Sequence, residues 1–227
     1  MKRALVLLTY NEIEALPKIF DRIPLGCADE AFAVDGGSMD GTREFLASRG
    51  LRILDQPRRG RGVAFRVAAE ATEAEALAFF SPDGNEDPAD IPRLLEKIRE
   101  GYDMAVASRM MPGAFNEEDV SRFRPRKWVN QAFGLIANLL WNRGPFVTDT
   151  INGFRAVRRQ AFEAMACDAD GFVIEYQMSI RAMKLGLRVA EIPTREGPRL
   201  GGRSTAESLP TGLVFLRQLW REIRAGL

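Results

Sequence analysis

Short apolar runs alternate along the chain with stretches in which apolar residues recur at helical spacing. The apolar runs predict strands over residues 4–9, 31–35, 51–54, 76–80, 103–108, 153–157 and 188–192. The helical spacing predicts helices over 14–22, 41–48, 62–72, 89–100, 126–141 and 172–185, with a terminal helix from about Pro210. Strands that alternate with helices form βαβ units, so we expect an α/β fold: a Rossmann-related single domain over 1–227, whose mostly parallel central sheet is flanked by helices.

The first two predicted strands end abruptly in polar residues and glycine. Leu8 is followed by Thr-Tyr-Asn-Glu, and Val34 by Asp-Gly-Gly-Ser. Since ligands of open α/β sheets bind beyond the carboxyl ends of the strands, Asn11 and Asp35 would face one crevice. Asp35 can accept a hydrogen bond from a ribose hydroxyl or a base N–H, and Gly36 allows close approach of the backbone. The pattern indicates nucleotide binding.

These stretches resemble the family 2 glycosyltransferases of GT-A fold, whose openings read roughly PTYNE and VDDGSxDGT. Two positions depart from that pattern, because Leu8 replaces the proline and Gly36 replaces the second aspartate. The resemblance implies an enzyme that transfers a sugar, with inversion, from a nucleotide diphosphate sugar. It implies nucleotide contacts by Thr9, Tyr10, Asn11, Glu12, Asp35, Ser38 and Arg61.

A polar turn follows the predicted strand that ends at residue 80. Oxygen-rich turns at the end of a strand suit Mg²⁺ or Mn²⁺ bound against a diphosphate. The family carries an Asp-x-Asp motif at this place, and its first aspartate is Ser81 in this chain. The resemblance implies that Asp83, with Asn85, binds the divalent cation and that Asp83 is catalytic. Fewer charged ligands make metal use less secure than in the family pattern.

The segment 58–64 is basic, rich in glycine and placed just before a predicted helix. Backbone N–H groups and the helix dipole at such a position favour an anion, with Arg61 as a further cation. A solvated turn is the alternative, and the residues of this segment alone do not decide between the two.

Segments 149–159, 172–176, 191–193 and 199–204 resemble, in order and spacing, those of dolichyl-phosphate mannosyltransferases. Arg155 stands in an otherwise apolar strand, so an anionic ligand or a buried carboxylate such as Asp149 should satisfy it. The resemblance implies acceptor contacts or phosphate binding by six residues: Arg126, Arg155, Glu175, Arg199, Arg203 and Ser204. Of these, Arg126, Arg199 and Arg203 would be catalytic. A structural ion pair of Glu175 and a merely exposed loop at 199–204 remain alternatives.

The segment 109–145 contains a basic cluster interleaved with aromatic residues and then an apolar helix. It is expected to face the acceptor or an anionic membrane surface, although a core helix with a solvated entry loop fits equally. The segment 206–227 predicts an amphipathic helix, which would pack against the domain or a second subunit. The sequence therefore leaves two kinds of partner possible: a second copy of the chain in a homodimer, and a membrane-anchoring protein.

Composition limits the remaining classes. The net charge of +1 gives no support to non-specific nucleic-acid binding. The chain has no histidine, which excludes imidazole bases and histidine-bound zinc, and its 2 cysteines lie far apart in the sequence. No run approaches the roughly 18 apolar residues of a membrane span. We expect a cytoplasmic protein, soluble or peripheral on the membrane.

The acceptor implied by the resemblance is a polyprenyl phosphate of the dolichyl type. Two alternatives remain: a glycosyltransferase with a soluble hydroxyl acceptor, and a catalytically reduced protein that binds nucleotide sugars. The second is motivated by Gly36 and Ser81.

Overall fold

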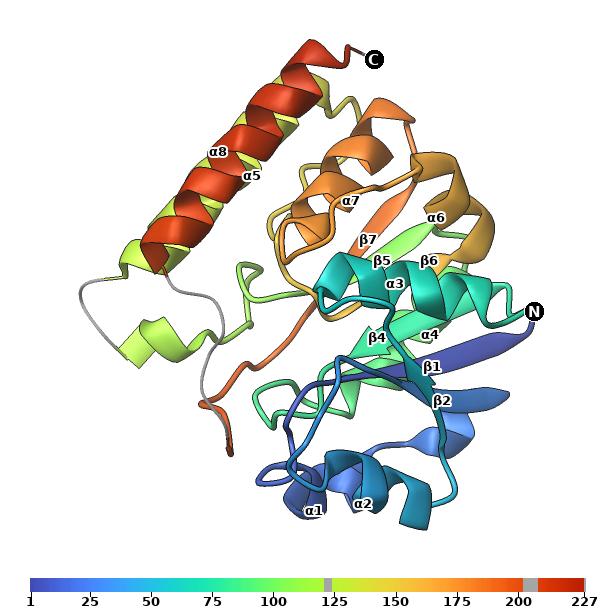
Figure 1. Ribbon diagram of the computed structural model, residues 1–227. Helices are drawn as coiled ribbons and strands as arrows, with labels where there is room; N and C mark the ends of the chain where they lie inside the picture. The colour runs from blue at the N-terminus through green and yellow to red at the C-terminus, as the bar shows by residue number, and fades with distance from the viewer. Residues whose placement is uncertain (121–123, 202–207, 227) are drawn as a thin grey trace.

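The computed structural model describes residues 1–120, 124–201 and 208–226. A seven-stranded sheet in the order β3-β2-β1-β4-β6-β5-β7 runs through the molecule (Figure 1). Its strands are β1 (Arg3–Thr9), β2 (Glu30–Asp35), β3 (Arg52–Asp55), β4 (Ala76–Phe80), β5 (Met104–Ser108), β6 (Arg155–Arg158) and β7 (Val189–Pro193). These bounds agree with the seven predicted strands to within two residues.

The expectation of a mostly parallel sheet is confirmed. β1 pairs in parallel with β2 and β4, β2 with β3, and β5 with β7, whereas β6 runs antiparallel to β4 and β5. Thr9 and Asp35 are register partners at the ends of β1 and β2. The loops that follow β1, β2 and β4 therefore leave the sheet at the same edge.

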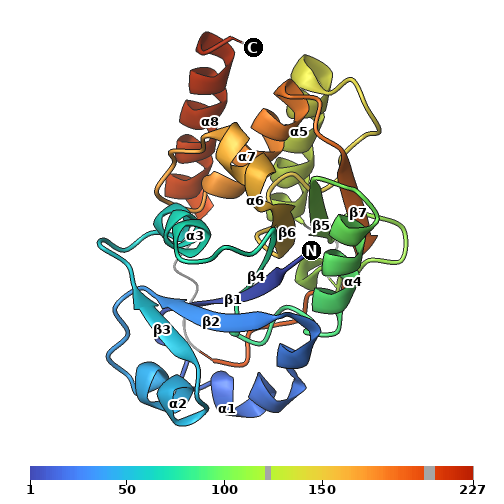
Figure 2. The ribbon, with the colours of Figure 1, turned by 90° about the vertical axis from the view of Figure 1, so that its right-hand side faces the viewer.

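Helices cover both faces of the sheet (Figure 2). One face carries α1 (Leu16–Ile19), α2 (Thr42–Ser48) and α4 (Asp90–Arg99), whose apolar residues form one buried cluster. The other face carries α3 (Arg61–Glu70), α6 (Arg159–Met165) and α7 (Ile174–Lys184), which belong to a second cluster. Each strand contributes alternate side chains to the two clusters, so the sheet is apolar on both faces.

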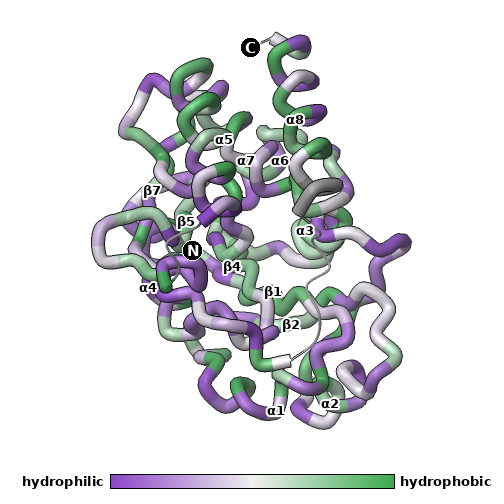
Figure 3. The backbone as a smooth tube through the Cα atoms, turned by 90° about the vertical axis from the view of Figure 1, so that its left-hand side faces the viewer, coloured by the Kyte–Doolittle hydropathy of each residue, from purple (hydrophilic) through white to green (hydrophobic). Residues whose placement is uncertain are grey.

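Two long helices, α5 (Pro125–Trp141) and α8 (Ser208–Arg224), extend from the second face (Figure 1). They flank α7, and the rings of Phe133, Tyr176 and Phe215 join the three helices with centroids 5.5 Å apart. Green, apolar stretches recur along both helices in Figure 3. No helix of the described residues is long and apolar enough to span a membrane.

Two local predictions were wrong. The helix expected over 14–22 is shorter: α1 gives way to a 3-10 turn at Phe20–Arg22, and Pro24 prevents further helix. The sequence pattern also missed α6, which follows β6 directly and has no turn residue to announce it. The other 3-10 turns are Leu25–Cys27 and Glu117–Val120.

Candidate functional site

The loops after β1 and β2 are held together around Asp35. This carboxylate is fully buried and accepts hydrogen bonds from the Thr9 hydroxyl, the Gly37 amide, the amide and hydroxyl of Ser38, and the Arg43 guanidinium. Burial acts to raise the pKa of Asp35, but the bonds from Ser38 and Thr9 outweigh it and hold the pKa below its ordinary value. Asp35 thus shapes the turn, and its direct contact with a nucleotide stays a prediction.

The β1 loop is fixed by the same set of polar residues. The Asn11 amide donates to the Ser38 hydroxyl at 2.8 Å, and the Glu12 amide donates to the Thr42 hydroxyl at 2.8 Å. Asn11 adopts the left-handed conformation, with φ of 55°, which asparagine tolerates better than most residues. These bonds place the residues after β1 at the mouth of a cavity.

This first cavity has a volume of ≈ 560 Å³ and lies beyond the ends of β1, β2 and β4. Its polar lining comprises Thr9, Tyr10, Asn11, Glu12, Gln56, Arg59, Arg61, Ser81, Asp83 and Arg199. Five of the seven predicted nucleotide contacts therefore line one cavity. The other two, Asp35 and Ser38, lie beneath it.

A second cavity, of ≈ 500 Å³, adjoins the first. The two share Arg61, Ser81, Asp83, Phe172 and Arg199 in their linings. The polar part of the second cavity includes Asn85, Arg109, Arg126, Glu175 and Glu196, and its apolar part includes Val129, Phe133, Ile151 and Phe215. The amino-terminal half of α5 and residues of α8 thus form the wall opposite the sheet.

Asp83 and Arg199 meet where the cavities join. Their side chains lie 3.1 Å apart, and the Asp83 side chain is 4% exposed. The Leu200 amide donates to the Asp83 carbonyl and the Gly197 amide to the Asn85 carbonyl, so the segment 197–200 is docked on the turn after β4. Burial raises the pKa of Asp83, which Arg199 opposes. A guanidinium thus neutralises the predicted metal ligand.

The oxygen donors around Asp83 fit a divalent cation. Burial, with repulsion from Asp83, raises the pKa of Glu12 to about 8. The side-chain oxygen of Asn85 is buried and has no hydrogen-bond partner in the described parts of the chain. Those parts contain no group of three or more His, Cys, Asp and Glu residues that could hold a metal.

The amino terminus of α3, where the sequence left an anion site and a solvated turn open, packs against segment 169–170. The amides of Gly62 and Val63 donate to the Asp170 carbonyl, and a Cβ on Gly62 would lie 1.8 Å from the Ala169 oxygen. The glycine is therefore required by close packing of segment 169–170, and a protein carbonyl occupies the donors that an anion would use.

Arg61, the first residue of α3, turns into the site instead. It forms an ion pair with Glu175 and donates to the Ser81 hydroxyl at 2.9 Å. Gly153 makes room for it, because a Cβ there would lie 2.0 Å from the Arg61 guanidinium. The ion pair predicted as an alternative for Glu175 is thus present. The Oε2 atom of Glu175 is buried and has no hydrogen-bond partner in the described residues.

Arg155 lies below the site. It is fully buried, and its guanidinium donates to the backbone carbonyls of Asn152 and Glu175. Burial lowers the pKa of Arg155 to about 10. The expected partner Asp149 pairs with a different arginine. Arg155 lines neither cavity, and its hydrogen bonds instead connect β6 to α7.

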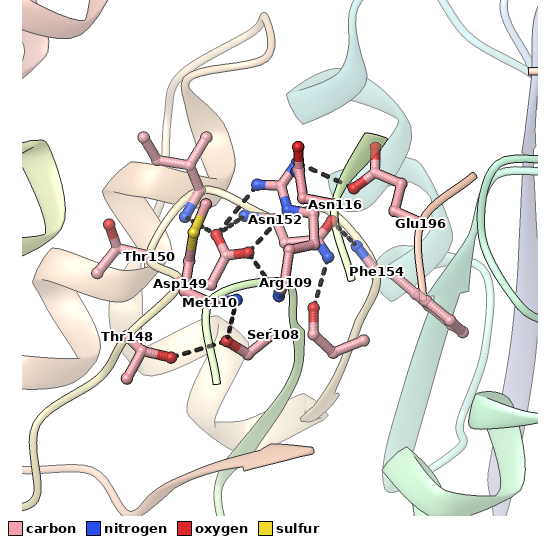
Figure 4. Close-up of polar contacts among 12 residues, drawn as sticks. Ser108, Arg109, Met110, Asn116, Thr148, Asp149, Thr150, Asn152, Phe154 and Glu196 are labelled. Carbon is pink, nitrogen blue, oxygen red and sulfur yellow. Dashed lines mark hydrogen bonds and ion pairs between the residues drawn. The ribbon is translucent and has the colours of Figure 1, made fainter. Parts of the chain in front are cut away.

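That other arginine is Arg109, which sequence reasoning missed. Figure 4 shows its guanidinium between Asp149, at 2.8 Å, and Glu196, at 3.1 Å. Glu196 in turn accepts from the Asn85 side chain at 3.2 Å. Arg109 follows β5 directly, so the same rule about strand ends that selected Asp35 would have selected it.

The remaining predicted acceptor residues are only partly described. Arg126, in the first turn of α5, lines the second cavity and lies 3.6 Å from Glu117. Together with Lys127, Arg109 and Arg199 it also lines an adjoining recess of ≈ 310 Å³. Arg203 and Ser204 fall outside the described residues.

Comparison with known proteins identifies relatives over most of the chain. The family model described as Glycosyl transferase family 2 matches residues 4–165. Glycosyltransferase AglJ of Haloferax volcanii is 32% identical over 225 residues, which cover 95% of this chain and 70% of that protein. A dolichyl-phosphate hexose transferase of the same organism is 30% identical and covers 91% of each chain. An undecaprenyl-phosphate mannosyltransferase of Micrococcus luteus is 30% identical and covers 85% of this chain and 82% of its own.

Solved structures with a similar fold include the glucosyl-3-phosphoglycerate synthase of Mycobacterium tuberculosis. Its complex with Mn²⁺, UDP-glucose and phosphoglyceric acid has a TM-score of 0.75, is 21% identical, and covers 97% of this chain and 79% of its own. At that identity the likeness concerns the fold. It confirms the GT-A-like, Rossmann-related architecture expected from the sequence.

Proposed function

We propose that this chain, which belongs to glycosyl transferase family 2 and is a glycosyltransferase, transfers a sugar from a nucleotide diphosphate sugar to a polyprenyl phosphate with inversion. The names of three relatives support that acceptor: a dolichyl-phosphate hexose transferase, an undecaprenyl-phosphate mannosyltransferase and a polyprenol monophosphomannose synthase. A nucleotide-sugar donor is supported by the solved complexes with UDP-glucose.

The observation that carries the proposal is the junction of the two cavities at Asp83 and Arg199. The first cavity, of ≈ 560 Å³, is lined mainly by polar and charged residues, and the diphosphate of a nucleotide bound in it would lie at the junction. The second combines an apolar wall with four arginines and four carboxylates, and an amphiphile with an anionic head and a hydrocarbon tail would bind with its head at the arginines. Donor and acceptor would thus meet at one point from two directions.

The reaction needs no general base, because an acceptor phosphate is already anionic near neutral pH. The chain, which has no histidine, is left with two tasks: to position the phosphate for attack and to stabilise the departing diphosphate. Arg109, Arg126 and Lys127 line the recess where the acceptor phosphate would bind. Arg199, and the predicted Arg203 and Ser204, would bind phosphate oxygens nearer the junction.

A divalent cation, when bound, supplies positive charge to offset the charge that develops on the leaving diphosphate. The carboxylate of Asp83 and the side-chain oxygen of Asn85 would hold it, with the Glu12 carboxylate nearby. Mn²⁺ in the solved complexes of similar fold supports this use of a cation.

A polyprenyl acceptor places the reaction at a membrane surface, and α5 and α8 suit that position. They expose eleven large apolar residues: Trp128, Val129, Leu135, Ile136, Leu139, Leu140, Leu213, Val214, Leu216, Trp220 and Ile223. Arg143 and Arg217 are exposed on the same part of the molecule. Apolar residues beside cations favour peripheral binding to an anionic bilayer. The second cavity begins between the same helices, so the acceptor tail would remain in the bilayer.

A transfer assay tests the proposal. The purified protein is incubated with Mn²⁺, a labelled UDP-sugar or GDP-sugar, and either a short-chain polyprenyl phosphate or 3-phosphoglycerate. A labelled polyprenyl phosphate sugar whose anomeric configuration is inverted, as read by NMR, is the expected product. Transfer to 3-phosphoglycerate alone would favour the soluble acceptor, and release of free sugar from every donor without transfer would contradict both acceptors.

A further inference from the structure

The end of the first cavity farthest from the second has its own chemistry. Tyr10, Gly36, Gln56 and Arg59 line the first cavity and do not line the second. They lie next to one another, since a Cβ on Gly36 would be 3.2 Å from the Tyr10 ring and 3.5 Å from Gln56 Nε2. The carboxylates of the cavity, Glu12 and Asp83, interact with each other near Arg199 instead. With the diphosphate at the junction, this end would receive the base.

The side-chain amide of Gln56 has one orientation here. Its oxygen accepts the Gly60 amide N–H at 3.0 Å, which a side-chain NH₂ group is unable to do. The nitrogen Nε2 therefore points the other way, toward Gly36, and donates to no other group in the described parts of the chain. Because Gly36 has no side chain, that donor is open to the cavity.

The other two residues supply a flat surface and more donors. The Arg59 guanidinium lies over the Tyr10 ring, 3.6 Å from its centroid. An aromatic ring and a stacked guanidinium both present planar faces to a base, and a guanidinium has no acceptor. Of the side chains of Tyr10, Gln56 and Arg59, only the Tyr10 hydroxyl thus has a free acceptor, and the Gln56 nitrogen and the Arg59 guanidinium are donors.

We propose that Gln56 reads the exocyclic group of the donor base and selects a keto base, uracil or guanine, over an amino base, adenine or cytosine. Uracil O4 and guanine O6 accept hydrogen bonds, whereas the amino groups at the matching positions of cytosine and adenine donate. Gln56 Nε2 can donate a hydrogen bond to either keto oxygen, whereas it would face another donor in either amino group. This inference rests on the proposed function, because it assumes that the first cavity binds a nucleotide.

Calorimetric titration of the full chain with UDP, GDP, CDP and ADP, each with Mn²⁺, tests the inference. At least one keto nucleotide should bind roughly tenfold or more tightly than both amino nucleotides, because a mismatched buried donor costs about one such factor. Gln56→Glu keeps an oxygen for the Gly60 amide and replaces Nε2 with an acceptor. It should weaken the keto nucleotide by roughly the same factor and strengthen CDP or ADP relative to it.

Three further variants sharpen the result. Gln56→Met removes the donor at nearly constant size and should abolish the preference without reversing it. Gly36→Ala should weaken every nucleotide, since the added methyl presses on Tyr10. Gln160→Glu, on the exposed side of α6, makes the same chemical change away from the cavity and should alter nothing.

The outcomes separate the two proposals. Equal binding of keto and amino nucleotides by the wild-type chain, or an unchanged preference in both Gln56 variants, overturns the base-reading role and leaves the glycosyltransferase proposal standing. Absence of binding by all four nucleotides overturns both. A keto preference that Gln56→Glu reverses and Gln160→Glu preserves supports the inference.

Discussion

The guanidinium of Arg199 lies 3.1 Å from the carboxylate of Asp83, at the place where a divalent cation would bind. Arg199 belongs to the segment 197–200, which is docked by backbone hydrogen bonds on the turn that carries Asp83. If the proposed cation binds Asp83, it competes with Arg199 for this carboxylate, and we expect the guanidinium to move from it. The released guanidinium would then be free to bind phosphate oxygens of the substrates.

We expect Asp83→Ala to lower transfer by more than about 100-fold, because the cation loses the carboxylate that we propose as its ligand in the turn after β4. The fold should persist, since the one ion pair that is broken involves a partly exposed arginine. Transfer kinetics and thermal unfolding check both statements. Asp87→Ala, in the same turn with a side chain 40% exposed, is the control and should retain activity. Retained turnover in Asp83→Ala would remove Asp83 from the mechanism.

Arg199→Gln should bind Mn²⁺ without nucleotide more tightly than the wild-type chain, by roughly three- to tenfold, the equivalent of about 1 kcal/mol for a partly exposed ion pair. The same variant should transfer sugar more slowly, because phosphate oxygens lose a ligand. Electron paramagnetic resonance of free Mn²⁺ measures the first effect and steady-state kinetics the second. Unchanged Mn²⁺ affinity would mean that Arg199 and the cation do not compete.

The ends of the strands were predictable because burial follows local patterns. β1, β2 and β4 are continuous apolar runs, and the polar residues after Thr9, Asp35 and Phe80 converge wherever three such strands are parallel. The first cavity is therefore lined by five of the seven predicted nucleotide contacts. The family resemblance supplied the roles of these residues, which their spacing alone does not give.

Two contacts that the sequence does not reveal have a common physical cause, which is that a distant segment completes each of them. Gly62 looked like part of an anion-binding loop, but its amide is used by the Asp170 carbonyl. Arg109 was missed because its two carboxylates, Asp149 and Glu196, come from separate loops. Sequence separation hides both contacts, although the position of Arg109 directly after β5 is a local signal of the kind that selected Asp35.

Arg109→Lys should destabilise the protein by about 2 to 3 kcal/mol. The arginine donates from two nitrogens to Asp149 and from a third to Glu196, and lysine has neither the planar fork nor the reach to both carboxylates. Urea unfolding followed by circular dichroism measures the change. Arg49→Lys, in an exposed pair with Asp21, should cost less than about 0.5 kcal/mol. Equal stabilities of the two variants would contradict the structural weight given to Arg109.

Stability should depend on pH through Glu86. Burial raises the pKa of Glu86 to about 8, from an ordinary value of 4.5. The native state therefore binds this proton more tightly than the unfolded state, and stability falls as the pH rises from about 4.5 to 8. Glu86→Gln carries no such charge, so its melting temperature should exceed that of the wild type by at least about 3 °C at pH 9 and match it near pH 5. Glu73→Gln, whose side chain is 89% exposed, should show no such trend.

The exposed apolar residues of α5 and α8 give a prediction about membrane binding that is independent of catalysis. Leu139 and Leu213 are 76% and 69% exposed, one on each helix, and neither lines the first or the second cavity. If both helices lie on the bilayer, each leucine is in contact with lipid. Leu139→Glu and Leu213→Glu each replace that aliphatic contact with a charge that anionic lipid repels. Leu185→Glu changes another exposed leucine, 51% exposed, just after α7.

Flotation with vesicles of phosphatidylglycerol and phosphatidylcholine measures the effect. The wild-type chain and Leu185→Glu should float together with the vesicles, and binding should weaken as salt is raised, because part of the attraction is screened over about 8 Å at physiological ionic strength. Leu139→Glu and Leu213→Glu should each lower the partition coefficient by roughly tenfold or more, since each loses an aliphatic contact and gains a repulsive charge.

Transfer to a water-soluble, short-chain polyprenyl phosphate should be unaffected, because neither residue reaches the site. Equal flotation of all four proteins would mean that α5 and α8 pack against something other than a bilayer, and gel filtration of the same samples would then report a second copy of the chain directly.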